Sequence, residues 1–161
     1  MAMLRFIAAL AVLTFTASAC SRGEVTIDGA WKTTSIELGG EKYVDEFHRE
    51  IHGKAEDGKY SATLGAGNAP LSITLKGTYT LDPSTDPKSI DIHPAKDANQ
   101  ALINQSLGVG PDRNILAIYE RSGGSLRICG DLTGKSRPTE FKTAKGTQQF
   151  LLTLERDDDA R

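Results

Sequence analysis

Two histidines and a glutamate lie close together in the segment 48–52 (HREIH), and these residue types can bind a metal ion. The spacing differs from the H-E-x-x-H of zinc metalloproteases, because Glu50 comes two places after His48. On a strand, His48, Glu50 and His52 would share one face, and Asp91 and His93 could join them only from a neighbouring strand. The alternative is a solvated polar face. We adopt it and expect neither a metal nor a cofactor.

The other segments that resemble catalytic motifs are incomplete. The segment 123–127 (GGSLR) lacks the closing glycine of the G-x-S-x-G nucleophile elbow, and 65–70 lacks the third glycine of a phosphate loop. The H-x-E that starts at His48 also opens the nucleobase-deaminase pattern, but no P-C-x-x-C follows it. The acidic run 157–159 has neither the spacing nor the glycine of a calcium loop. The sequence therefore favours a protein without catalytic activity.

Composition places the chain among ordinary globular proteins. It has 161 residues, 25% of them charged and 39% hydrophobic, which suits one domain. Lys and Arg total 19 and Asp and Glu 21, a net charge of −2 that argues against nucleic-acid binding.

Residues 1–19 have the features of a secretory signal. Arg5 supplies a positive charge, and residues 6–19 are uncharged, mostly apolar and too short for a comfortable membrane span. Two processing routes fit the end of the segment, 17–20 (ASAC). An ordinary signal peptidase would cut after Ala19. The stretch also resembles a bacterial lipobox, in which Cys20 becomes lipidated, although Ala17 replaces the usual leucine. The third alternative is an uncut anchor.

We expect lipidation of Cys20 and attachment to the membrane through that lipid. Ser21 is not an aspartate, so under the usual bacterial sorting rule the expected destination is the outer membrane, within the cell envelope. A soluble periplasmic or secreted protein is the alternative. The state of Cys20 also decides that of Cys129: acylation leaves Cys129 as a lone shielded thiol, whereas a free Cys20 permits a Cys20–Cys129 disulfide.

The rest of the chain alternates between apolar and polar residues, as strands do. The clearest case is 71–81 (LSITLKGTYTL), with period two over its length and Gly77 on the apolar face, which predicts a bulge or a barrel corner. Residues 43–52 are expected to begin with a short helical turn near Val44 and continue as a strand. Residues 94–110 are expected to form a long polar connection that is either mobile or a lid. Further strands are predicted at 30–38, 59–64, 88–93, 114–121, 125–129 and 148–156.

About eight short antiparallel strands without a long helix predict an all-β barrel or sandwich. The segment 29–31 (GAW) resembles the G-x-W opening of lipocalins, and Arg156 ends the last strand, where lipocalin-like proteins often place an arginine across that tryptophan, Trp31. Six segments in fixed order resemble a family of small uncharacterised lipocalin-like domains abundant in planctomycete-type bacteria: 77–82, 87–92, 118–120, 126–129, 137–141 and 152–156.

The resemblance covers residues 28–156 and departs from the family over 47–71. It implies export and a single up-and-down, lipocalin-like (calycin-like) barrel of about eight strands, and it implies no activity. The expected organisation is a signal peptide at 1–19, a tether at 20–27, the barrel at 28–156 and a polar tail at 157–161.

The leading functional hypothesis is a module that binds a small apolar or amphipathic ligand inside the barrel. A cell-envelope interaction or structural module with a solid core is the alternative. Arg127, Arg137 and Glu140 could enter the barrel mouth and orient an anionic head group, or could form a surface pair. Tyr119 is expected in the core or in a ligand wall, and Cys129 shares a strand face with Arg127.

Overall fold

The structure is a computed structural model that describes residues 26–43, 51–65, 72–106, 108–110 and 113–159. The expected signal segment, Cys20, His48 and Glu50 lie outside the described residues.

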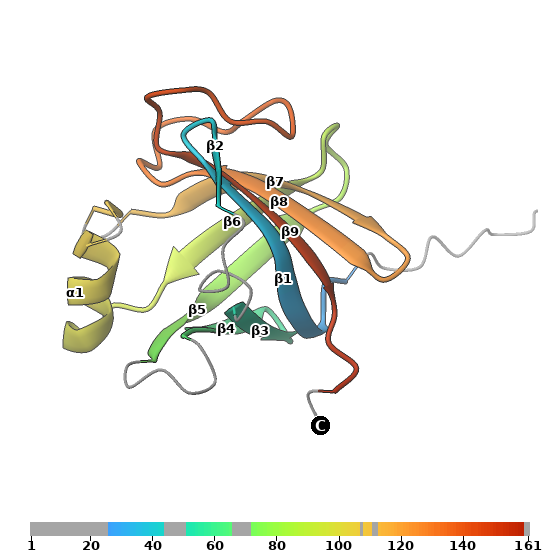
Figure 1. The fold of residues 1–161 in the computed structure, drawn as a ribbon, viewed down its shortest axis with the longest axis horizontal. Helices are drawn as coiled ribbons and strands as arrows, with labels where there is room; N and C mark the ends of the chain where they lie inside the picture. The colour runs from blue at the N-terminus through green and yellow to red at the C-terminus, as the bar shows by residue number, and fades with distance from the viewer. Residues whose placement is uncertain (1–25, 44–50, 66–71, 107, 111–112, 160–161) are drawn as a thin grey trace, which may run out of the picture.

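Within these described residues, nine antiparallel strands form one sheet that closes on itself (Figure 1). The sheet order is β2-β1-β3-β4-β5-β6-β7-β8-β9, and pairing of β1 with β9 closes the barrel. The short β2 pairs only with the end of β1, so eight strands make the wall. The predicted all-β, eight-stranded, up-and-down barrel is thus confirmed. The strands are β1 (Gly29–Leu38), β2 (Glu41–Tyr43), β3 (Ile51–Glu56), β4 (Lys59–Leu64), β5 (Ile73–Asp82), β6 (Ser89–Pro94), β7 (Ile115–Ser122), β8 (Ser125–Asp131) and β9 (Gln149–Arg156).

Period-two alternation decides which side chains enter the barrel, because residues that oppose each other on paired strands point to the same face. Leu152 of β9 lies opposite Ile128 of β8, which lies opposite Tyr119 of β7, and all three belong to the apolar interior. Arg127 and Cys129 alternate with Ile128 and therefore point outward.

The sequence predicted a bulge or a barrel corner at Gly77, and the structure has no bulge there. The pairing of Gly77 with Tyr60 on β4 and with Pro94 on β6 continues the register on both sides without interruption. A side chain at Gly77 would collide with the Tyr60 ring and the His93 carbonyl, so the glycine makes room for them. A register shift is instead found between Thr33 and Ser35 of β1, where β1 pairs with β9.

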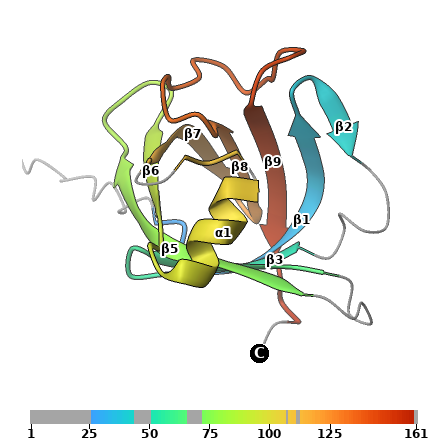
Figure 2. The same cartoon turned by 90° about the vertical axis from the view of Figure 1, so that its left-hand side faces the viewer.

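The segment 94–110, expected as a long polar connection that is mobile or a lid, contains a helix, α1 (Ala98–Ser106). It begins after Asp97, whose carboxylate accepts a hydrogen bond from the backbone N–H of Gln100 (3.0 Å), a helix N-cap. In Figure 2 the helix lies across the end of the barrel that faces the viewer. Within the described part of the chain, none of the helices has the length and apolar character needed to cross a membrane.

The β8–β9 connection (132–148) packs on the outside of the barrel. The Cys129 thiol donates a hydrogen bond to the carbonyl of Lys142 (3.5 Å), and the Arg127 guanidinium lies 4.7 Å from the centre of the Phe141 ring. Cys129 and Ile118, which oppose each other on the outward face, are buried as a result. The connection therefore serves as a second layer over β7 and β8.

Candidate functional site

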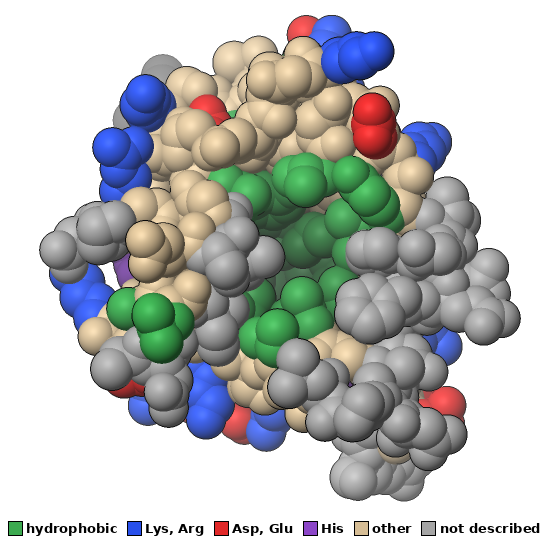
Figure 3. Space-filling model, turned by 60° about the vertical axis from the view of Figure 1, so that its left-hand side comes forward, with side chains coloured by type: hydrophobic (Ala, Val, Ile, Leu, Met, Phe, Trp, Pro, Cys, Tyr) green, Lys and Arg blue, Asp and Glu red, His purple; other side chains and the backbone are tan. Residues whose placement is uncertain are grey.

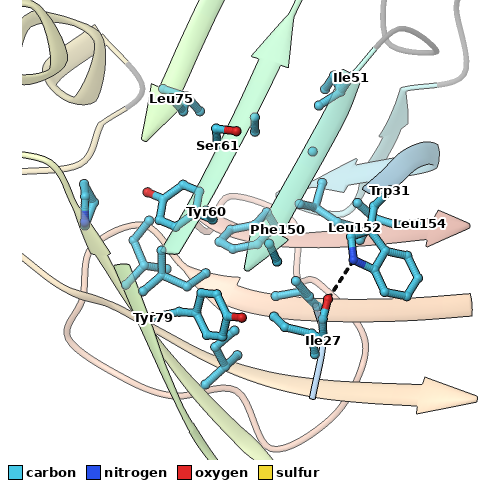
Figure 4. Close-up of a pocket in the computed structure, with 18 of the residues that line it drawn as sticks. Ile27, Trp31, Ile51, Tyr60, Ser61, Leu75, Tyr79, Phe150, Leu152 and Leu154 are labelled. Atoms are coloured by element: carbon cyan, nitrogen blue, oxygen red, sulfur yellow. Dashed lines mark hydrogen bonds between the residues drawn. The ribbon is translucent and has the colours of Figure 1, made fainter. Parts of the chain in front are cut away.

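The barrel interior contains a cavity of about 320 Å³. Inward residues of nearly every strand line it, and most of them are aliphatic or aromatic (Figure 4). On β9, for example, Phe150, Leu152 and Leu154 alternate with outward residues and contribute to the wall. Figure 3 shows the apolar hollow open at the face beside α1. Protein cavities that bind small ligands are typically ~300–1,000 Å³ and mainly apolar, so this cavity has the volume of a small ligand site.

The opposite, closed end is built around Trp31. This residue is 2% exposed, and its indole N–H donates to the carbonyl of Ile27 (2.8 Å; Figure 4). The Arg156 guanidinium lies over the Trp31 ring, 4.3 Å from its centre. Gly29 has a φ of +135°, and a Cβ there would overlap that guanidinium, so this position of the G-x-W segment must be glycine. Ile27, assigned above to the tether, is buried and lines the cavity floor.

At the open end, Gln100 fastens α1 to the barrel wall. Its side-chain carbonyl accepts a hydrogen bond from the backbone N–H of Lys76 on β5 (3.0 Å), where β6 has already ended at Pro94. Gln100 is only 4% exposed. Val109, after the helix, is buried against Ile115 and Phe150 and lines the cavity. The helix and the residues after it therefore form part of the cavity rim.

Polar groups in the described lining are few. The Tyr79 hydroxyl donates to a carboxylate oxygen of Asp28 (2.7 Å), and this hydrogen bond holds the pKa of Asp28 below its usual value. Burial raises the pKa of Tyr79 to about 12 and does the same for Tyr60. Both phenols are thus neutral at physiological pH. Lys54 borders the cavity, but its ammonium pairs with Glu56 (3.0 Å) on the outer surface.

The predicted polar cluster lies outside this cavity. Arg137 donates to the carbonyls of Ile90 (3.1 Å) and Ala117 (2.5 Å) and pairs with the Asp91 carboxylate. It therefore joins β6 and β7 from outside, because the β8–β9 connection runs along the outer wall. Of the two alternatives left open for Arg137, these contacts correspond to a structural pair on the surface and not to a group in the barrel mouth. Glu140 pairs instead with Lys142 (2.6 Å), with both side chains mostly exposed.

The other members of the cluster also stay out of the cavity. Arg127 pairs with Glu120 (3.3 Å) and donates to the carbonyl of Phe141 (3.3 Å). Burial raises the pKa of the Cys129 thiol, which opposes formation of a reactive thiolate. Tyr119 faces inward and is buried in the core, with only 1% of its surface exposed. Its hydroxyl has no hydrogen-bond partner among the described residues.

The residues considered above as possible metal ligands do not lie together in the described part of the chain. The imidazole Nδ1 of His52 lies 2.6 Å from a carboxylate oxygen of Asp157, and Asp91 is held by Arg137. Among the described residues, no group of three His, Cys, Asp or Glu side chains could hold a metal ion. Asp157, expected in a solvated tail, is buried, and its N–H donates to the carbonyl of Ala30 (3.0 Å).

Tyr60 was not among the candidate residues of the sequence analysis. A period-two pattern identifies 59–64 as a strand but does not show which face enters the barrel. Gly77 was the residue that could have pointed to Tyr60, since a glycine on the apolar face of a strand often marks the close approach of another group.

Comparison with known proteins supports the fold alone. The lipocalin-like protein from Bacteroides uniformis ATCC 8492 gives a TM-score of 0.51 at 16% identity, covering 81% of this chain and 97% of that chain. An uncharacterised protein from Bacteroides eggerthii DSM 20697 gives 0.49 at 12% identity, covering 80% and 98%. No family model matches the chain, and no curated protein matches it. The chain thus has a lipocalin-like barrel fold.

Proposed function

We propose that this barrel binds one small, uncharged, apolar or amphipathic molecule and performs no catalysis on it. The observation that carries the proposal is the open cavity of about 320 Å³, whose described lining has no charged side chain directed inward. A liquid water molecule occupies ~30 Å³, so the cavity suits a ligand of on the order of ten to twenty non-hydrogen atoms. Burial of apolar ligand surface is the expected driving force.

The cavity also disfavours the alternative, a module with a solid core, since side chains do not fill the interior. A ligand would enter beside α1, where the hollow opens to the surface (Figure 3). It would contact the inward faces of β4, β5 and β9 and end above Trp31, which makes tryptophan emission a natural reporter.

The test is titration of the mature protein with N-phenyl-1-naphthylamine, a neutral dye that brightens in apolar surroundings. We expect saturable one-to-one binding. Ala62→Phe would fill the cavity, because Ala62 lies opposite the inward Gly53 and Leu75, and should weaken dye binding at least tenfold. Thr63→Phe adds the same ring on the outward face of β4 and should leave binding unchanged.

Two outcomes would overturn the proposal: no saturable binding to the wild-type protein, or equal affinity of the wild type and Ala62→Phe. Native mass spectrometry of protein purified from an exporting bacterial host, against a denatured control, provides a second measurement. A discrete extra mass in the native spectrum would begin to identify a natural ligand.

We further propose that the chain is exported and anchored in the cell envelope through a lipid on Cys20. The supporting observation is the charged, apolar and small-residue order of residues 1–20. Metabolic labelling with a radioactive fatty acid should mark the wild type and not Cys20→Ala. Release of an unlabelled mature chain into the soluble fraction by the wild type would favour plain secretion instead.

We also propose kinship with the lipocalin-like domains of planctomycete-type bacteria, on the six ordered segments described above. Support would be a multiple alignment in which those domains match residues 28–156 with all six segments in register. Alignment that fails outside the G-x-W segment would reject it.

A further inference from the structure

The cavity holds two inward tyrosines with different surroundings. The hydroxyl of Tyr79 on β5 donates its hydrogen bond to the Asp28 carboxylate (2.7 Å), so it has no second proton to donate to a ligand. The hydroxyl of Tyr60 on β4 has no hydrogen-bond partner among the described residues, although both side chains line the same cavity (Figure 4). Among the described residues, the fully buried side-chain hydroxyls without a partner belong to Thr33 and Tyr119. Tyr60 is only partly buried, so its unpaired hydroxyl is accessible from the cavity that the residue lines.

The strand register fixes the place of the Tyr60 hydroxyl. Tyr60 lies directly opposite Gly77, and a Cβ at Gly77 would come within 2.7 Å of ring atom Cε1 and 2.9 Å of the hydroxyl oxygen. The ring therefore lies over the bare backbone of β5, and the hydroxyl stands on the cavity side of that strand. Because Gly77 and Tyr60 pack so closely, the donor is held in place before any ligand arrives.

We propose that the Tyr60 hydroxyl donates the hydrogen bond that recognises one neutral oxygen, a carbonyl above all, of an otherwise apolar ligand. The inference rests on the proposed function and narrows the ligand from uncharged apolar or amphipathic molecules to those that carry a neutral hydrogen-bond acceptor. Tyr60 would then determine specificity without any chemical step.

Charge argues for a neutral ligand group. Among the described lining residues only Lys54 is charged, and its ammonium lies outside, paired with Glu56. A carboxylate in the cavity would be desolvated without a counter-charge, which proteins avoid. Burial raises the pKa of Tyr60 to about 12, so the phenol keeps its proton at neutral pH and can donate it.

The experiment compares three probes of nearly equal size in displacement of N-phenyl-1-naphthylamine: butyrophenone, n-butylbenzene and 4-phenylbutyrate. Tyr60→Phe removes only the hydroxyl. It should weaken butyrophenone binding about three- to tenfold, the value of one neutral hydrogen bond, and leave butylbenzene binding unchanged. Phenylbutyrate should bind most weakly to the wild type at neutral pH. Tyr79→Phe is the matched control and should not change the ketone-to-hydrocarbon ratio.

A direct readout is the infrared carbonyl stretch of bound butyrophenone, expected at lower frequency in the wild type than in Tyr60→Phe. An equal effect of Tyr60→Phe on ketone and hydrocarbon, or an unshifted carbonyl band, would overturn the inference while leaving the proposed function intact. Failure of all probes and of the dye to bind would instead remove the proposed function itself. Thermal unfolding of Tyr60→Phe checks the fold, and we expect a melting temperature no lower than that of the wild type.

Discussion

The guanidinium carbon of Arg156 lies 4.3 Å from the centre of the Trp31 ring, and the two residues are cross-strand partners on β9 and β1. The contact joins the last strand of the barrel to the first at the end away from α1. Trp31 forms part of the cavity floor, so the same contact closes the barrel and supports the candidate site.

Replacement of Arg156 should destabilise the barrel. Arg156→Ala removes a cation–π contact and the packing of the arginine stem over the indole, worth about 1–2 kcal/mol together. The measurement is the free energy of unfolding in urea. Glu155→Ala, at the exposed neighbouring position, serves as control and should change stability by less than about 0.5 kcal/mol. Equal stability of the two variants would contradict the role of the contact.

Gly29 and Arg156 should be energetically coupled. Gly29→Ala places a methyl group where the guanidinium lies, at a φ of +135° that side chains rarely adopt. In the Arg156→Ala background the overlap disappears and only the backbone strain remains. A double-mutant cycle should therefore give a coupling energy of about 1 kcal/mol or more, and additive effects would show that the collision is relieved in another way.

Arg137 should matter for stability and not for ligand binding. Its three partners are the carbonyls of Ile90 and Ala117 and the Asp91 carboxylate, all on the outer side of β6 and β7. Arg137→Met should cost about 2 kcal/mol, because hydrogen bonds of charged groups are stronger than neutral ones and this site is only partly exposed. Lys142→Met, which breaks an exposed pair, should cost less than about 0.5 kcal/mol. Altered dye affinity in Arg137→Met would contradict this prediction and indicate that Arg137 contributes to ligand binding.

Strand positions could be predicted because alternation is a local property. The segment 59–64 was expected as a strand and is β4 with the same bounds, and the segment 71–81 corresponds to β5 within two residues. The destination of Arg137 could not be predicted in this way. It depends on the path of the β8–β9 connection across strands up to 47 residues away in sequence.

The helix over the open end had a local sequence signal that was overlooked when 94–110 was predicted as a polar connection. Asp97 and Gln100 are three residues apart, the spacing of a capping box, and the structure shows the carboxylate of Asp97 bound to the Gln100 N–H. The helix segment has no charged residue and mixes apolar with polar residues in little amphipathic pattern, so periodicity alone did not predict a helix. Its position depends on tertiary contacts, chiefly the one from Gln100 to Lys76.

Loss of the Gln100 side chain should loosen α1 from the barrel. Gln100→Ala removes the acceptor of the Lys76 backbone N–H beyond the end of β6. Hydrogen exchange should then accelerate at the Lys76 amide and across α1, with little change at amides in the middle of β8. Gln105→Ala, at an exposed helix position, is the control. Unchanged exchange at Lys76 would mean that other contacts hold the helix.

Asp28 should give the closed end a pH dependence. The hydrogen bond from Tyr79 holds the pKa of Asp28 below its ordinary 3.8, so the folded protein binds the Asp28 proton less readily than the unfolded chain does. The stabilisation is therefore fully present above that ordinary value and is lost as the pH falls through the lower, folded value. Asp28→Ala should melt below the wild type at pH 7, and the gap should narrow below about pH 4.

The control for Asp28→Ala is a variant that also removes one negative charge but leaves the hydrogen bond between Tyr79 and Asp28 in place. Asp86→Ala, in the exposed turn after β5, has that property and corrects for the change in net charge. Tyr79→Phe removes the donor instead of the acceptor, so it should reproduce the narrowing gap if the hydrogen bond is the cause. A gap between wild type and Asp28→Ala that stayed constant down to pH 2 would mean that Asp28 stabilises the barrel through packing and not through its ionised carboxylate.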